Sequence, residues 1–373
     1  MLIKGLILKE IAHSIGIDQV GITSAEPLFY MKKHLEKRLK EQRVTPFETR
    51  NIDSRIKPGL QLHNCQSIIT FAVPYTAAEH HVPRGAAEPA GKVARCARGL
   101  DYHALIDSLG QRLVKGLQQE YGTGFESRIL CDRSPLLERE LVRNSGLGLI
   151  GENCTLINHR YGSYTALGTI LNTLTFESSQ PDHQYCRQCG RCRETCPTGA
   201  LIAPYIINPY LCLSYLSQAP GCFPRAMRSK MGRQIYGCDI CQEICPHNQE
   251  AQCSTIPEMA FSFFPAEPLL LPLLYLTQNE FKATINLTSA GWRGKTIIQR
   301  NAIIALGNLK DPLTVKPLAN FLKNDQRSII RLHIAWALGQ IRGEKALFAL
   351  EKAYLNDPDL AVRKEAKLAL EEQ

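Results

Sequence analysis

Residues 186–197 read CRQCGRCRETCP, a run of four cysteines with the spacing C-x2-C-x2-C-x3-C-P. In bacterial ferredoxins this spacing binds [4Fe–4S] clusters: three thiolates hold one cluster and the fourth reaches its neighbour. A structural zinc site normally has two C-x2-C pairs separated by a longer insert, which fits this run poorly. The stretch therefore predicts an iron–sulfur domain.

A second motif, CDICQEICP at residues 238–246, lacks the leading cysteine of the first, because Ile235 occupies that position. Cys212, well upstream, is the natural substitute, and Cys222 is its chief rival. In two-cluster ferredoxins the last cysteine of each motif binds the cluster held by the other motif. The same exchange here gives two ligand sets. The first set is Cys186, Cys189, Cys192 and Cys245, and the second is Cys196, Cys212, Cys238 and Cys241.

Ten of the fourteen cysteines lie between residues 180 and 255, where long apolar runs are few. A segment so poor in core residues needs a metal cofactor to fold around. Clustered cysteines without an export signal also favour metal ligands over disulfides, because cytosolic thiols are kept reduced. Five cysteines outside the two ligand sets are expected to be small buried hydrophobes: Cys65, Cys96, Cys131, Cys154 and Cys253.

The 373-residue chain is long enough for two or three domains. Its apolar start is broken by charges and predicts an amphipathic helix, so we expect a cytoplasmic protein. No apolar run approaches the roughly 20 residues that span a bilayer. The excess of 44 basic over 35 acidic residues favours an anionic partner such as nucleic acid, although ordinary solubility charge fits that number equally well.

Residues 1–178 alternate helix-like and strand-like segments, which predicts an α/β domain. Helical spacing covers residues 3–15 and 101–118, and the strand-like runs are residues 19–23, 67–73 and 127–131. Ser134 followed by Pro135 predicts a helix start, with serine at the cap and proline at the first helical position.

The C-terminal part is a repeat, because the pair Ala-Leu recurs at residues 305, 337 and 369, each time late in an amphipathic helix. Helix pairs at this spacing are typical of an α-solenoid. The predicted domains are therefore an α/β domain (1–178), a ferredoxin-like domain with two [4Fe–4S] clusters (179–260) and HEAT-like α-solenoid repeats (261–373).

Two short patterns in the first domain resemble cofactor motifs without their context. Gly146-x-Gly148-x-x-Gly151 matches the dinucleotide fingerprint, but a helix precedes it and no acidic residue follows at the expected distance, so it predicts a tight helix-to-strand connection. His103 lies in a sequence like the start of D-x-H-x-x-G, a cobalamin-ligating motif, but Ile106 replaces the glycine. His103 is therefore interpreted as a structural residue at a helix N-terminus.

Asp132 follows a predicted strand and precedes a predicted helix. The local pattern favours a turn or capping aspartate, and the alternative is a general acid whose pKa is raised beside a cofactor.

A basic segment lies between the cysteine motifs, at residues 223–236, with four cations and no acidic residue. Basic residues interleaved with aromatics suit a phosphate backbone with exposed bases, and a solvated surface loop fits equally well. The candidate nucleic-acid contacts are Arg225, Arg228 and Lys230.

Taken from end to end, the chain resembles the epoxyqueuosine reductases, which complete the hypermodified base queuosine at the tRNA wobble position. The resemblance depends on the order of short motifs at residues 54–58, 94–103, 131–132, 146–153 and 161–164, followed by both cysteine motifs and the repeats. It departs at Cys96, where many relatives have an aromatic residue, and at His247, where many have tryptophan.

The resemblance implies that cobalamin binds base-off in the N-terminal domain and receives electrons through the two clusters from an external low-potential donor. It implies Asp132 as proton donor, which reverses the local interpretation. The residues that it places around cobalamin are Arg55, Arg95, Asn153, Ser163 and Tyr164.

The implied reaction reduces epoxyqueuosine to queuosine in a tRNA with a GUN anticodon, and the basic segment and the repeats would hold the anticodon stem-loop. We expect a monomer with no membrane partner. Two alternatives are an enzyme like the corrinoid reductive dehalogenases and a non-catalytic iron–sulfur electron-transfer protein with a HEAT docking module.

Overall fold

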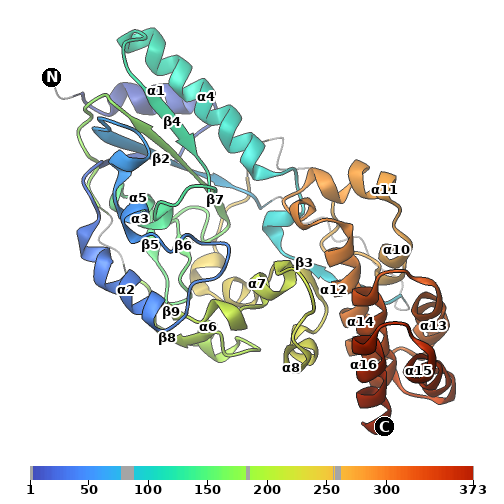
Figure 1. The fold of residues 1–373 in the computed structure, drawn as a ribbon. Helices are drawn as coiled ribbons and strands as arrows, with labels where there is room; N and C mark the ends of the chain where they lie inside the picture. The colour runs from blue at the N-terminus through green and yellow to red at the C-terminus, as the bar shows by residue number, and fades with distance from the viewer. Residues whose placement is uncertain (1–2, 77–87, 182–184, 255, 257–261, 373) are drawn as a thin grey trace. The chain divides into compact units, whose positions relative to one another are not determined.

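The computed structural model describes all residues except 1–2, 77–87, 182–184, 255, 257–261 and 373 (Figure 1). The chain forms two compact units. The first comprises residues 1–78, 99–210 and 240–261, and the second residues 79–98, 211–239 and 262–373. The predicted ferredoxin-like range therefore contributes to both units. Among the described helices, none is long and apolar enough to cross a membrane.

The first unit is built on a four-stranded sheet with the order β1-β2-β7-β4 (Figure 1). Its strands are β1 (Val20–Ser24), β2 (Ser67–Pro74), β7 (Thr165–Asn172) and β4 (Ser127–Leu130). All three pairings are antiparallel. The three predicted strands are confirmed. The mixed helix and sheet content is also as expected, although alternating helices and strands more often accompany parallel sheets.

Helices cover both faces of this sheet (Figure 1). On one face lie α1 (Leu6–Ser14) and α4 (Tyr102–Tyr121), whose apolar side chains share a core with Ile69. The neighbouring Ile68 lies in the other core, because successive strand residues point to opposite faces. That second face is covered by α2 (Lys32–Lys40), α3 (Ile52–Ile56) and α5 (Glu138–Asn144). Both predicted helices are confirmed.

The predicted helix start at Ser134-Pro135 is wrong, because α5 begins at Glu138. The Ser134 hydroxyl accepts from Leu136 N–H and donates to the Glu138 carboxylate, which forms a turn ahead of the helix. The predicted connection at the three glycines is confirmed: α5 leads through Gly146 and Gly148 into β5 (Leu149–Ile150), which pairs with β6 (Leu156–Ile157).

The cysteine-rich part of the chain contains only short elements, as expected of a segment that folds around a cofactor. In the first unit these are α6 (Arg191–Glu194), β8 (Leu201–Ala203), β9 (Ile206–Ile207) and α9 (Ile240–Glu243). In the second unit they are α7 (Leu213–Gln218), α8 (Arg225–Arg228) and β10 (Gln234–Tyr236), which pairs in parallel with β3 (Lys92–Val93).

The second unit is dominated by helices, with α10 (Leu270–Tyr275) and α11 (Gln278–Ala283) preceding the repeat. The repeat helices are α12 (Lys295–Leu309), α13 (Val315–Asn324), α14 (Ser328–Ile341), α15 (Glu344–Asn356) and α16 (Leu360–Glu371). α14 packs between α12 and α16 (Figure 1). A Cβ on Gly307 would lie 3.0 Å from Ala337 Cβ, and one on Gly339 would lie 2.6 Å from Ala369 Cβ. The glycines therefore permit the close approach of these helices.

Candidate active site and cluster sites

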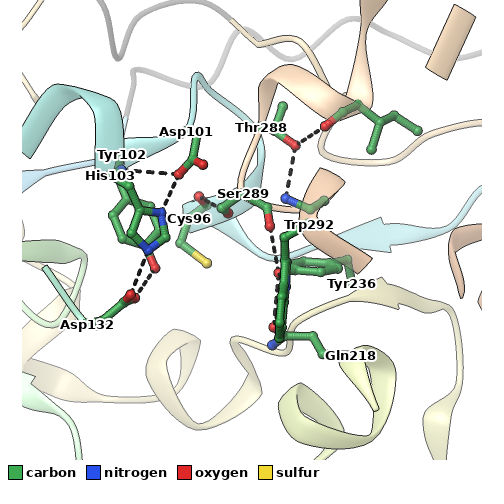
Figure 2. Close-up of polar contacts among 12 residues, drawn as sticks. Cys96, Asp101, Tyr102, His103, Asp132, Gln218, Tyr236, Thr288, Ser289 and Trp292 are labelled. Atoms are coloured by element: carbon green, nitrogen blue, oxygen red, sulfur yellow. Dashed lines mark hydrogen bonds and ion pairs between the residues drawn. The ribbon is translucent and has the colours of Figure 1, made fainter. Parts of the chain in front are cut away.

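Asp132 lies in the turn after β4, where side chains from the start of α4 contact its carboxyl group (Figure 2). His103 Nε2 lies 2.6 Å from Asp132 Oδ1, and the Tyr102 hydroxyl donates to Oδ2 at 2.5 Å. The Asp132 side chain is nevertheless 52% exposed. The carboxyl group is therefore held by two side chains and remains accessible to a substrate.

The ring of His103 lies between two carboxylates. Its Nδ1 is 2.5 Å from Oδ1 of Asp101, the N-cap of α4. Burial alone would lower the pKa of His103, but hydrogen bonds to Asp101 and Asp132 outweigh burial and raise the pKa from 6.5 to about 9. The ring is therefore cationic at neutral pH and donates from both nitrogens. Its predicted place at a helix N-terminus is confirmed, but no local pattern indicated its contact with Asp132.

The backbone at Asp132 is strained. Its φ of 36° lies in the left-handed region, and the N–H of Arg133 donates to the carbonyl of Cys131 across it. Such strain costs about 1–3 kcal/mol and is concentrated at functional sites. The Asp132 N–H donates at 2.8 Å to Glu138, whose pKa is raised to about 7 mainly by burial. The turn is therefore held by a buried carboxyl group that sequence analysis missed.

Cys131, Asp132 and His103 bring one potential metal-ligand atom each within 4.8 Å of one another. Cys131 is 5% exposed, and burial strongly raises the pKa of its thiol, so the thiol stays protonated. Both nitrogens of His103 already face carboxylates. We therefore interpret the group as a proton network. Cys131 is buried as predicted.

Four cysteines of the predicted first ligand set line one pocket of the first unit, namely Cys186, Cys189, Cys192 and Cys245. Burial, together with the nearby Glu152 and Cys186, raises the pKa of Cys192 to about 11. Burial also raises the pKa of Cys245, with Cys186 and Cys189 adding to the effect. Four converging thiols match the donor set of a [4Fe–4S] cluster, whose iron would stabilise the thiolates.

The second predicted set is Cys196, Cys212, Cys238 and Cys241. Burial opposes ionisation of Cys196, but the Thr198 hydroxyl and backbone N–H groups of residues 198, 200 and 201 outweigh it and lower the pKa of the thiol. Backbone donors aimed at a cysteine sulfur suit an anionic cluster. Cys212 is half-buried at the N-cap of α7, whereas its rival Cys222 is exposed.

The expectation that Cys253 is buried is wrong, because Cys253 is exposed, while Cys65, Cys96 and Cys154 are half-buried.

Two residues that the resemblance places around cobalamin have buried donors without a hydrogen-bond partner among the described residues. They are Nε of Arg55, whose Nη1 pairs with Glu48 at 2.8 Å, and Nδ2 of Asn153, whose Oδ1 accepts from Thr155. Unpaired buried donors are costly, so a ligand that accepts hydrogen bonds fits these positions.

The other residues in that set are held by protein contacts. Ser163 donates from its hydroxyl to Gln242, within the second cysteine motif, and from its backbone to Asn248, just after that motif. Tyr164 is buried, and its ring meets that of Tyr75 edge to face. Arg95 belongs to the second unit, where its backbone N–H donates to Asp239 at 2.7 Å.

The basic segment is partly neutralised within the second unit. Arg228 is 3% exposed, lies 3.1 Å from Glu365 and donates to the Phe223 carbonyl. Arg225 pairs with Glu365 and Glu372. The prediction that Arg228 contacts phosphate therefore does not fit its burial, whereas Lys230 is exposed.

An exposed tryptophan of the second unit also was missed by sequence analysis (Figure 2). Trp292 is 55% exposed, and its indole N–H donates to the Tyr236 hydroxyl at 2.8 Å and to Gln218 at 3.2 Å. The guanidinium of Arg293 lies 4.6 Å from the ring centroid. An ordered aromatic ring beside an arginine is a typical platform for a nucleobase.

These features define an iron–sulfur oxidoreductase with a helical repeat, and comparisons with known proteins agree. Family models match three segments: Epoxyqueuosine reductase QueG, DUF1730 at residues 55–133, the 4Fe-4S double cluster binding domain at residues 185–248, and HEAT repeats at residues 294–371. The chain is 35% identical over 363 residues to the epoxyqueuosine reductase of Bacillus anthracis, covering 96% of this chain and 95% of the relative. The Bacillus subtilis enzyme is 34% identical over 365 residues, covering 98% and 93%.

Solved structures give the same result. An epoxyqueuosine reductase in complex with an epoxyqueuosine-modified stem loop of tRNA-Tyr superimposes with a TM-score of 0.93 at 34% identity, covering 98% of this chain and 97% of that one. The Streptococcus thermophilus enzyme superimposes with a TM-score of 0.90 at 34% identity and 98% coverage of both chains. The chain belongs to the epoxyqueuosine reductase family, an assignment that favours neither of the two alternative functions.

Proposed function

We propose that this protein reduces epoxyqueuosine to queuosine at the wobble position of a tRNA with a GUN anticodon. Family membership over nearly the whole chain supports the substrate. The observation that carries the chemistry is the exposed Asp132 carboxyl group, hydrogen-bonded at 2.6 Å to the His103 cation. Loss of the epoxide oxygen as water consumes two electrons and two protons, so a positioned proton donor is required.

Asp132 is the proton donor in this proposal. When its proton passes to the departing oxygen, the carboxylate that remains is stabilised by the His103 cation and by the Tyr102 hydroxyl. His103 Nε2–H can then return a proton to Asp132 across the same 2.6 Å contact. His103 and Tyr102 are positioning residues that act through Asp132.

Cobalamin, when bound, supplies the reducing equivalents at the epoxide carbon. Arg55, Arg95, Asn153, Ser163 and Tyr164 are proposed to hold it, and the unused buried donors of Arg55 and Asn153 support that assignment. The crossed cysteine sets given above would hold the two clusters, which would supply electrons from an external low-potential donor. We further propose a cytoplasmic monomer.

The proposed RNA interface combines charge and stacking. Lys230 contributes an exposed cation, with Arg225 at the edge of the same segment, and Trp292 with Arg293 offers a surface for a base. Arg228 is left out, because its guanidinium is buried against Glu365.

Mass spectrometry of tRNA nucleosides tests the function directly. Cells that lack the gene should accumulate epoxyqueuosine, and a plasmid copy should restore queuosine. Unchanged queuosine in the deletion strain, with no other reductase gene present, would overturn the proposal.

A further inference from the structure

The first repeat helix, α12, carries two fully buried polar residues, Arg300 and Asn301, whose side chains bond outside the repeat. Both contact residues 211–239, a segment that runs from just before Cys212 to the start of the second cysteine motif and belongs to the same compact unit. The apolar residues of that segment share one core with the repeat helices. The repeat and this part of the cluster region are therefore a single packed structure.

Arg300 binds backbone carbonyls at the end of α7. Its guanidinium donates to Ala219 and Gly221, both at 2.7 Å, and more weakly to Leu216 and Ser217. Among the described residues no carboxylate forms an ion pair with it, and burial lowers its pKa to about 10, so it remains a cation at neutral pH. A buried arginine that binds only carbonyls fixes the chain that it binds, because moving that chain would leave the charge unsolvated.

Asn301 joins that chain to the second cysteine motif. Its Nδ2 donates to the Ser217 carbonyl at 2.8 Å and to the Ile235 carbonyl at 2.7 Å, and its Oδ1 accepts from Arg300 at 3.0 Å. Gly237 N–H donates to the Ser217 hydroxyl at 2.9 Å. One buried amide thus connects α7 to β10.

Each end of this connection lies beside a proposed ligand of the second cluster. Cys212 is the N-cap of α7, five residues before Ser217. Cys238 directly follows Gly237, which has a φ of 65° and where a Cβ would lie 2.5 Å from Ala94 Cβ. The backbone position of Cys238 therefore depends on a glycine that is itself held by Ser217.

The equivalent arginines of the later repeats bond differently. Arg331 pairs with Asp357 at 2.8 Å and donates to the Asp325 carbonyl, and Arg363 donates to the Asp357 carbonyl. Both of these therefore stabilise the repeat from within. Arg300 occupies the same place in its repeat but binds the chain that carries Cys212.

We propose that Arg300 and Asn301 are positioning residues for the second [4Fe–4S] cluster, which hold the chain segments of Cys212 and Cys238 at a fixed separation. The inference depends on the proposed ligand set Cys196, Cys212, Cys238 and Cys241. It assigns the first repeat helix to cluster assembly, in addition to any contact with RNA.

The test is anaerobic reconstitution of the full chain carrying Asn301→Leu, with iron and sulfide analysis and EPR spectroscopy of the reduced protein. The wild type should hold about eight irons per chain and the variant about four, with the spectrum of the first cluster retained. Ser217→Ala is a milder variant that removes the hydroxyl that accepts from Gly237 N–H and donates to the Ser214 carbonyl within α7. It should lower the second cluster's occupancy or shift its EPR signal.

The matched control is Arg331→Leu, which breaks a buried pair in the next repeat and should lower Tm while leaving about eight irons. Eight irons with an unchanged spectrum in both Asn301→Leu and Ser217→Ala would overturn the proposal, as would equal iron loss in the control. A wild type with only four irons would refute the ligand set itself, whereas failure of the function would leave these iron contents unchanged.

Discussion

His103 and Asp132 are 29 positions apart in the chain, yet Nε2 of one lies 2.6 Å from Oδ1 of the other. Because Asp101 holds the second ring nitrogen, the histidine is cationic and its orientation is fixed. The pair joins the start of α4 to the turn after β4, on a backbone whose φ at Asp132 is strained. This arrangement is suited to proton delivery rather than to capping.

Replacing Asp132 with asparagine should abolish proton delivery while keeping the size of the side chain. We expect turnover of an epoxyqueuosine stem-loop to fall by about 100-fold or more, because general acids contribute about 10²–10⁴. Iron content and cobalamin binding should not change. Asp53→Asn is the control, since Asp53 is an exposed carboxylate paired with Lys57 on the surface. An active Asp132→Asn enzyme would contradict the assignment.

Because His103 acts as a cation, the rate of turnover should fall at high pH. Its folded pKa is raised from 6.5 to about 9, so the stability that the cationic ring contributes is fully present below about pH 6.5 and is lost as the pH rises through about 9. Turnover and folding stability should therefore both decline across this range. His103→Gln should be slower by about 10-fold at pH 7 and should lack the decline near pH 9. An identical pH profile in wild type and variant would remove His103 from the proton network.

Much of the architecture follows from local sequence pattern, because strands such as β2 and helices such as α4 carry their own periodicity. The pattern misled at Ser134-Pro135, because the Ser134 hydroxyl bonds to the Glu138 carboxylate ahead of the helix. A capping signal in sequence cannot reveal which group its side chain will meet.

The site was predictable only in part. Cysteine spacing indicated the four thiols that line the first cluster pocket, because three of them lie within seven residues of one another. The partners of Asp132 and of Arg228 lie in distant segments: Glu365 is 137 residues beyond Arg228. A segment with four cations and no acid therefore looked free to bind phosphate, although its acidic partners are Glu365 in α16 and Glu372 at the C-cap of that helix.

Crossed ligation predicts that two cysteines of one motif belong to different clusters. Cys245→Ser should remove the same cluster signal as Cys186→Ser, because both thiols line one pocket. Cys241→Ser, only four residues away, should remove the other signal. Each variant should retain about four of eight irons, and EPR spectra of the reduced proteins distinguish the two clusters. Matching spectra for Cys241→Ser and Cys245→Ser would show that the ligands are not crossed.

Replacing two cations of the basic segment, Lys230 and Arg228, should have different effects: one on RNA binding and the other on folding stability. Lys230 is exposed, so Lys230→Ala should weaken stem-loop binding and reduce the slope of log K against log salt by about one. The same variant should change the free energy of unfolding by less than about 0.5 kcal/mol.

Arg228 is buried against Glu365, so Arg228→Ala should cost about 3–5 kcal/mol of folding free energy. In variants that remain folded, the salt slope for Arg228→Ala should equal that of the wild type, because its guanidinium cannot reach a phosphate. Filter binding across a salt series, with urea unfolding in parallel, measures both quantities. A reduced slope in Arg228→Ala together with an unchanged slope in Lys230→Ala would reverse the assignment of these two residues.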